Sequence, residues 1–156
     1  MEQRTVLFVD DDVIVLQSLE RGLMDESYNK YFASSCKDAL EIIQREVVHV
    51  LVTDMIMPDM TGIELLREAR KVHPDIVCIA LSGYENDKEV KNAVDQGEIF
   101  TLMKKPWKLN SASFEKTIRL ALEQFEVDDH NEQGKLGKLE QYKTKLKKLI
   151  KLANDN

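Results

Sequence analysis

The sequence has few of the cysteines and histidines that build zinc centres and disulfide scaffolds, and it lacks the long apolar run of a membrane span. Its 156 residues include two cysteines, Cys36 and Cys78, and three widely separated histidines, so neither a zinc site nor a catalytic triad is indicated. No apolar run approaches the roughly 20 residues of a membrane helix, and the first residues do not form the apolar segment of a signal peptide. We therefore expect free thiols in a reducing, cytoplasmic environment and no membrane partner.

Nucleic acid is disfavoured as a partner by charge. Lys and Arg number 22 against 28 for Asp and Glu, which gives a formal net charge of −6, and a negative field repels the phosphate backbone. The charge is uneven, because residues 1–127 contain 23 acids and 15 bases whereas residues 128–156 contain 5 acids and 7 bases. This asymmetry indicates a globular body followed by a tail of different construction.

What the sequence does contain is an alternation of short apolar runs with segments of helical periodicity. The run at 47–53 is apolar on both faces, as in a central parallel strand. The full set of expected strands is 6–9, 31–33, 47–53, 76–81 and 100–103, and the expected helices are 13–24, 36–43, 63–72, 86–96 and 111–125. This order predicts βαβ units and a parallel sheet covered by helices on both faces.

Polar side chains follow the expected strands at the edge where such sheets bind ligands. They are Asp10, Asp11, Asp12, Asp54, Ser82 and Lys105. A single Asp there could simply cap a helix, but several carboxylates at one place repel one another unless a cation lies among them. Oxygen ligands without His or Cys select a hard ion such as Mg²⁺. Together with a hydroxyl and an ammonium group, the site suits a phosphoryl group, and a carboxylate can be its nucleophile.

Four segments together resemble the receiver domains of two-component response regulators. They are VLFVDDD (6–12), VLVTDMIMPDMTG (50–62), IALSG (79–83) and LMKKPW (102–107), in the order and spacing of that family. The resemblance covers roughly residues 4–126 and implies a flavodoxin-like, doubly wound (βα)5 α/β fold. Its five parallel strands would have the order 2-1-3-4-5, with a C-terminal helical extension. The ending in Lys-Pro-Trp is similar to one receiver subgroup.

The resemblance also implies a role for each residue at the strand ends. Asp54 would accept the phosphoryl group, and Ser82 and Lys105 would hold its oxygens. Mg²⁺ would be bound directly by Asp11, Asp54 and the backbone carbonyl of Ile56, and through a water by Asp10. Pro106 would follow a cis peptide bond. The phosphate would come from a sensor histidine kinase or a phosphotransfer protein, which makes the chain a phospho-accepting switch rather than a turnover enzyme.

Three positions depart from the family pattern or modulate it. Leu102 stands three residues before Lys105, where the family usually has Tyr or Phe, so signalling through an aromatic flip is not expected. Ile56 and Tyr84 occupy positions that tune dephosphorylation in the family. Because Ile56 offers no hydrogen bond to an attacking water and Tyr84 would shield it, we expect autodephosphorylation to take minutes or longer.

The expected domain plan is a receiver at 1–126, a linker at 127–137 and a helix at 138–156. The linker contains Gly134 and Gly137, which are poor helix interiors. Apolar residues then recur at alternating spacings of three and four, at Leu139, Tyr142, Leu146, Leu149 and Ala153. Three interpretations stay open for this lysine-rich helix, namely a connector, a dimerising coiled coil that leads to an output domain, and a basic binding face.

Signalling is expected to act through the surface made by residues 88–97, 100–103 and 111–125, which would contact an output partner or a second copy. Two other functions compete with this one. The run DDDVI (10–14) also fits the nucleophile motif of haloacid-dehalogenase-type phosphatases, although that family leaves MPDMTG unexplained. A constitutive interaction module is the other alternative.

Overall fold

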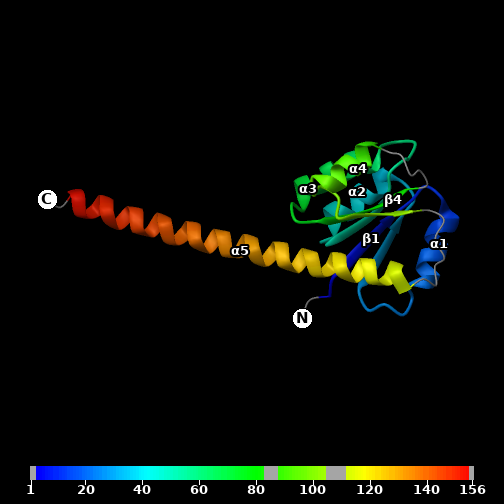
Figure 1. Cartoon of the computed structure of the whole chain (residues 1–156), viewed down its shortest axis with the longest axis horizontal. Helices are drawn as coiled ribbons and strands as arrows, with labels where there is room; N and C mark the ends of the chain where they lie inside the picture. Colours follow the sequence, from blue (N-terminus) through cyan, green and yellow to red (C-terminus); the bar gives the residue numbers. More distant parts are fainter. Residues whose placement is uncertain (1–2, 83–87, 105–111, 155–156) are drawn as a thin grey trace. The chain divides into compact units, whose positions relative to one another are not determined.

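The protein is described by a computed structural model, which covers residues 3–82, 88–104 and 112–154 (Figure 1). Strands and helices alternate along the chain, as the apolar periodicity predicts. The strands are β1 (Thr5–Val9), β2 (Asn29–Ala33), β3 (Val50–Asp54), β4 (Val77–Ser82) and β5 (Thr101–Lys104). The helices are α1 (Val13–Gly22), α2 (Cys36–Arg45), α3 (Gly62–Val72), α4 (Lys88–Asp95) and α5 (Ala112–Asn154).

The five strands form one parallel sheet in the order β2-β1-β3-β4-β5. This confirms the predicted fold class and strand order. The register pairs Val9 of β1 with Thr53 of β3, so the residues that follow these two strands leave the sheet side by side. The edge of the sheet where the strands end therefore brings residues about 44 positions apart in the chain into contact range.

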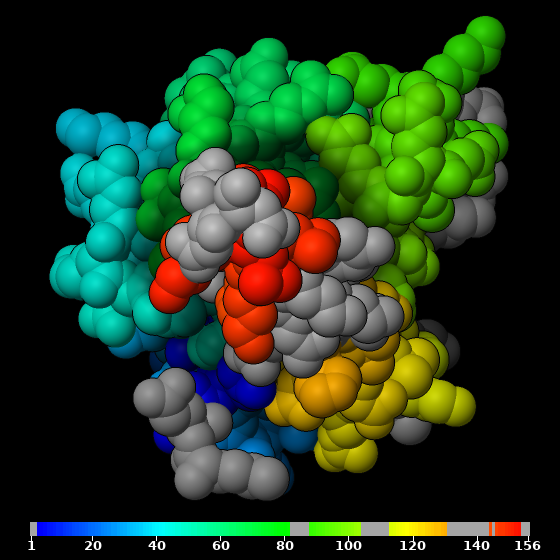
Figure 2. Space-filling view, turned by 90° about the vertical axis from the view of Figure 1, so that its left-hand side faces the viewer, coloured from blue at the N-terminus to red at the C-terminus, as the bar shows by residue number. Residues whose placement is uncertain are grey.

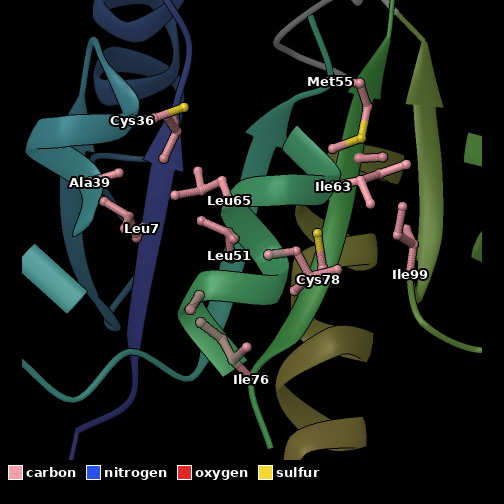
Figure 3. Packing of buried hydrophobic residues seen from close by; sticks show 14 of the residues in the cluster. Leu7, Cys36, Ala39, Leu51, Met55, Ile63, Leu65, Ile76, Cys78 and Ile99 are labelled. Atoms are coloured by element: carbon pink, nitrogen blue, oxygen red, sulfur yellow. The ribbon is translucent and has the colours of Figure 1, made fainter. Parts of the chain in front are cut away.

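Both faces of the sheet are buried, which explains why its strands are continuously apolar. Leu7 and Val9 of β1 belong to the layer under α2, α3 and α4, part of which Figure 3 shows, whereas Val6 and Phe8 belong to the layer under α1 and α5. Every residue of β1 and of β3 is buried. Each fully buried Leu, Ile or Phe side chain contributes roughly 1.5–3 kcal/mol to folding, so this central pair anchors the sheet.

The predicted starts of two strands were wrong by two or three residues, and those of the other three by one residue. β2 begins at Asn29 rather than at residue 31, because an edge strand tolerates polar side chains that apolar periodicity does not detect. β3 begins at Val50 rather than at residue 47, and Val47 is largely exposed. The apolar residues Val47 and Val48 therefore do not extend the strand.

The chain divides into two compact units, Met1–Phe125 and Glu126–Asn156. The predicted linker at 127–137 is helical in the structure, because α5 extends from Ala112 to Asn154. Each glycine there costs about 1 kcal/mol relative to Ala, but the Glu, Gln, Lys and Leu residues around them favour a helix, which propagates cooperatively once formed. Within the described chain, no helix combines the length and apolarity needed to span a membrane.

The last residue of the first unit packs where the strands begin. His49, directly before β3, is buried, and its Nδ1 accepts a hydrogen bond of 2.9 Å from the backbone N–H of Thr5. Its ring meets the ring of Phe125 edge-on, with centroids 4.8 Å apart. The guanidinium of Arg4 lies 5.2 Å from the centroid of the same ring. These contacts attach α5, at Phe125, to the amino ends of β1 and β3.

Candidate functional site

Three carboxylates meet at the carboxyl ends of the two central strands. One carboxylate oxygen from each of Asp10, Asp11 and Asp54 lies within 4.8 Å of the others. Asp10 is 0% exposed and Asp54 is 9% exposed, while Asp11 is exposed to solvent. Two acids that are buried beside a third are costly without a compensating positive charge. We call Asp10, Asp11 and Asp54 the acidic cluster.

The backbone around the end of β1 determines which of its three aspartates joins the cluster. The N–H of Asp10 donates to the carbonyl of Ala33 on β2 (3.2 Å), which continues the sheet by one residue. Asp10 Oδ1 accepts from the N–H of Asp12 (2.9 Å), and Asp12 Oδ1 accepts from the N–H of Ile14 (3.0 Å). Asp12 is therefore the N-cap of α1 and lies outside the acidic cluster.

A tightly folded loop carries the chain from Asp54 into α3. Asp54 Oδ1 accepts from the N–H of Ile56 (3.3 Å), and the N–H of Gly62 donates to the carbonyl of Met55 (3.1 Å). A Cβ at position 62 would lie 2.5 Å from the Asp54 carbonyl oxygen and against the Met55 side chain. Glycine is therefore required here by space. The sequence indicates only that Gly62 interrupts a strand and helix pattern.

Asp59 is a residue of the site that the sequence analysis missed. Its Oδ2 accepts a hydrogen bond of 3.1 Å from the backbone N–H of Cys36, at the start of α2. The thiol of Cys36 lies 3.7 Å from the carbonyl oxygen of Met60. The loop after Asp54 is thus attached to the N-terminus of α2 at two points. The segment MPDMTG alone does not reveal this role, because the N–H that Asp59 binds comes from a residue 23 positions away.

The two cysteines are buried free thiols, as predicted. Burial, reinforced by the negative charge of Asp59, raises the pKa of the Cys36 thiol to about 12. Burial also raises the pKa of Cys78 to about 12. Neither sulfur is therefore a thiolate near neutral pH.

The other predicted site residues are only partly visible. Ser82 ends β4, but its side chain lies outside what the structure describes, and Tyr84, Lys105 and Pro106 also lie outside the described residues. Leu102, at the position of the usual aromatic, is partly buried and packs against the core under α2, α3 and α4. Ile56 is 54% exposed. An apolar side chain therefore stands in solvent two residues after Asp54.

The donor set of the acidic cluster fits a hard divalent cation. All three groups are carboxylates, and Mg²⁺ prefers oxygen ligands and is usually bound by one or two carboxylates while it keeps several waters. The cluster also combines buried and exposed members, so that an ion would have both protein ligands and solvent beside it. The residues present are thus suited to Mg²⁺.

Comparison with known proteins assigns the fold to one family. A family model described as the response regulator receiver domain matches residues 6–113. A curated relative is the hydrogenase transcriptional regulatory protein HoxA of Cupriavidus necator, which is 37% identical over 106 residues. That match covers 68% of this chain and 22% of HoxA, so the chain spans only a part of its relative's length.

Two solved structures show the same architecture. The CheY-like response regulator receiver domain protein of Methanospirillum hungatei has a TM-score of 0.72 and 27% identity, covering 81% of this chain and 99% of that chain. A dimer of the beryllofluoride-activated NtrC4 receiver domain has a TM-score of 0.69 and 28% identity, covering 78% of this chain and 98% of that chain.

Proposed function

This chain belongs to the response regulator receiver domain family, and from that premise we propose that it is a switch controlled by phosphorylation of Asp54. The observation that carries the proposal is the acidic cluster, in which Asp54 lies at the end of β3 with two further carboxylates within 4.8 Å. The cap formed by Asp12 argues against the phosphatase alternative, because its carboxylate is engaged with the N-terminus of α1.

The proposed chemistry is nucleophilic attack by Asp54. An oxygen of its carboxylate forms a bond to the phosphorus of a phosphohistidine, and the phosphorus–nitrogen bond breaks. The imidazole nitrogen keeps the electron pair and takes up a proton, while Asp54 becomes an acyl phosphate. The N–H of Ile56, 3.3 Å from Asp54 Oδ1, helps to hold the carboxylate in place. We assign the Ser82 hydroxyl and the Lys105 ammonium to the phosphoryl oxygens, by the resemblance of their positions to the family motif.

We assign the Mg²⁺ ligands to the same edge of the sheet. Asp11, Asp54 and the backbone carbonyl of Ile56 would bind the ion directly, and Asp10 would bind it through a water. When bound, Mg²⁺ supplies positive charge that offsets the repulsion between the carboxylates and an incoming phosphoryl group. Asp10 is held by its own backbone hydrogen bond and by the N–H of Asp12, so its contribution is fixed before any ligand arrives.

The partner that supplies the phosphate is, we propose, a sensor histidine kinase or a phosphotransfer protein of the cytoplasm. Exposed apolar side chains adjoin the acidic residues in the sequence, since Ile14 is 71% exposed and Ile56 is 54% exposed. A phosphodonor that reaches Asp54 can bury such side chains, which favours a protein donor over small molecules. Tyr84 would shield the acyl phosphate from water and Pro106 would position Lys105.

Phosphorylation would change the surface formed by α4, β5 and the part of α5 before Phe125. Partly buried apolar side chains of this surface include Val94, Leu102 and Met103, and Leu120 is 44% exposed. The NtrC4 structure is described as an activated receiver domain dimer, and we propose that this chain forms a homodimer through the same three elements. The sequence also suggests the C-terminal helix as a dimer contact.

The test is phosphorylation by acetyl phosphate followed by intact mass measurement. The wild type should gain about 80 Da only when Mg²⁺ is present, and Asp54→Asn should gain nothing. Asp12→Asn is the matched control, because it removes an acid from the same segment that belongs to a helix cap, and it should still gain the adduct. An adduct that survives in Asp54→Asn and disappears in Asp12→Asn would contradict the proposal. No adduct on any variant would favour a constitutive interaction module.

A further inference from the structure

The end of the second unit exposes a row of large apolar side chains. Leu146 is 54% exposed, Leu149 is 64%, Ile150 is 57% and Leu152 is 64%. Leu146, Leu149, Ile150 and Ala153 follow the spacing i, i+3, i+4, i+7, which places them on one side of an α-helix. Figure 2 shows atoms of this terminal segment in red at the surface. We call Leu146, Leu149, Ile150, Leu152 and Ala153 the terminal apolar face.

Lysines border this face and outnumber the acids in its neighbourhood in the sequence. Lys147 lies three residues before Ile150, and Lys148 lies four residues before Leu152, so each is adjacent to an edge of the face. Both lysines, and Lys151 behind them, are exposed. Residues 141–156 contain five lysines and one acid, Asp155. The segment therefore carries apolar groups together with an excess of positive charge.

This charge pattern disfavours a second copy of the same helix as the occupant. Two such helices, packed through the terminal apolar face in either direction, would each bring several lysines to the seam and only one nearby acid, Asp155, to meet them. Pairing of identical helices normally depends on opposite charges at those flanking positions, and like charges there are destabilising. A surface that is apolar at its centre and acidic at its rim would instead match both features.

A lipid surface also offers negative charge, but the face suits a protein better. Helices that lie in the membrane interface combine a broad apolar side with aromatic anchors. The face itself contains no aromatic side chain, the nearest being Tyr142, and its eight residues make only about two turns of helix. The side chains of a partner helix can pack between Leu146, Leu149 and Ile150 and so contact each of them on several sides. A lipid surface would contact each of these side chains on its outer side only.

We propose that the terminal apolar face of α5 binds an acidic amphipathic helical surface of a partner protein. This inference does not depend on phosphorylation of Asp54, since it concerns the second unit alone. The probe is a dye-labelled synthetic helix of about four heptads with Leu at the seam and Glu at the flanking positions. A second helix with Gln at those flanking positions is the neutral control. Binding of each to the full chain is measured by fluorescence anisotropy.

The acidic helix should bind at least about tenfold more tightly than the neutral helix. Its affinity should fall as salt rises from about 0.05 to about 0.5 M, because the lysine contribution is screened. Leu149→Glu and the double variant Lys147→Glu/Lys148→Glu should each weaken binding at least about tenfold. Lys37→Glu, which reverses an exposed charge in the first unit, should leave binding unchanged. Helix content by circular dichroism identifies any variant that fails through loss of helix.

Three results would overturn the proposal. Equal affinity for the acidic and neutral helices would show that charge plays no part. Binding of the chain to vesicles of phosphatidylglycerol, with no binding of the acidic helix, would assign the face to a lipid surface. Self-association that is measured by sedimentation and abolished by Leu149→Glu, again without binding of the acidic helix, would assign it to a second copy.

Discussion

The two ends of α5 carry the same apolar spacing and have opposite surroundings. In the first unit, Phe114 and Ile118 are at most 1% exposed and pack against the sheet. In the second unit, Leu146 and Leu149 are 54% and 64% exposed. Spacings of three and four therefore specify a helix with one apolar side, but they do not specify whether the chain itself covers that side.

The largest difference in stability is expected when one apolar side chain at each end of α5 is replaced by that of alanine. Phe114→Ala should lower the free energy of unfolding of the receiver by about 3–5 kcal/mol, because it leaves a cavity in the core layer under α1 and α5. Leu149→Ala should change it by less than about 0.5 kcal/mol. Urea unfolding, followed by near-ultraviolet absorption or fluorescence, measures both. Similar losses for the two variants would mean that the terminal apolar face is buried in solution.

Replacement of a glycine by alanine should change stability in opposite directions in the two units. Gly62→Ala should destabilise the receiver by about 1–3 kcal/mol and slow phosphorylation, because the new Cβ meets the Asp54 carbonyl. Gly137→Ala should instead stabilise the helix by about 1 kcal/mol, as expected for a helix interior. Thermal unfolding and circular dichroism compare the two. A neutral Gly62→Ala would show that the loop after Asp54 can move away at little cost.

Alkaline pH should lower the free energy of unfolding of the receiver, because both buried thiols lie in the first unit. The pKa of Cys78 is raised by burial to about 12 from an ordinary value near 9. The folded state therefore holds the proton that the unfolded state releases, and the free energy of unfolding falls as pH rises from 9 towards 12. The slope is about 1.4 kcal/mol per pH unit, measured by urea unfolding. Cys78→Ala should remove this part of the slope, and an unchanged slope would contradict the assignment.

Loss of the hydrogen bond between the loop after Asp54 and α2 should have a smaller effect on stability. Asp59→Ala should lower the free energy of unfolding by about 1 kcal/mol and weaken Mg²⁺ binding, because the loop that carries Ile56 loses its contact with Cys36. Asp59→Asn keeps an acceptor oxygen and should retain most of both properties. Calorimetric titration with Mg²⁺ measures the affinity. Full Mg²⁺ affinity in Asp59→Ala would limit the role of Asp59 to stability.

The smallest change in stability is expected at Ile56. Because Ile56 is 54% exposed, Ile56→Asn should leave the free energy of unfolding nearly unchanged. It should nevertheless shorten the lifetime of phosphorylated Asp54 severalfold, since an amide can orient the attacking water. The mass of the phosphorylated protein, followed over time, gives the rate. A wild-type lifetime of a few seconds would contradict the expected slow autodephosphorylation.

The sheet could be predicted from the sequence because burial on both faces produces short continuous apolar runs, and these runs alternate with segments of helical periodicity. The same reasoning located the acidic cluster, since Asp10 directly follows β1 and Asp54 is the last residue of β3. It could not locate Asp59 or the spatial need for Gly62, because both depend on which backbone atoms lie nearby after folding. The prediction of a linker at 127–137 that interrupts the helix was wrong for a related reason. Gly134 and Gly137 lower helix propensity locally, whereas helix formation is decided over many neighbouring residues.

The two ends of β3 have different surroundings. The residue before it, His49, holds the ring of Phe125, and its last residue is Asp54. Its five buried residues span roughly 16 Å, and parallel neighbours on both sides prevent it from bending independently. The residue at which we propose phosphorylation and the residue that contacts Phe125 are thus joined by one strand that is paired on both sides, so we expect a displacement at one end to reach the other.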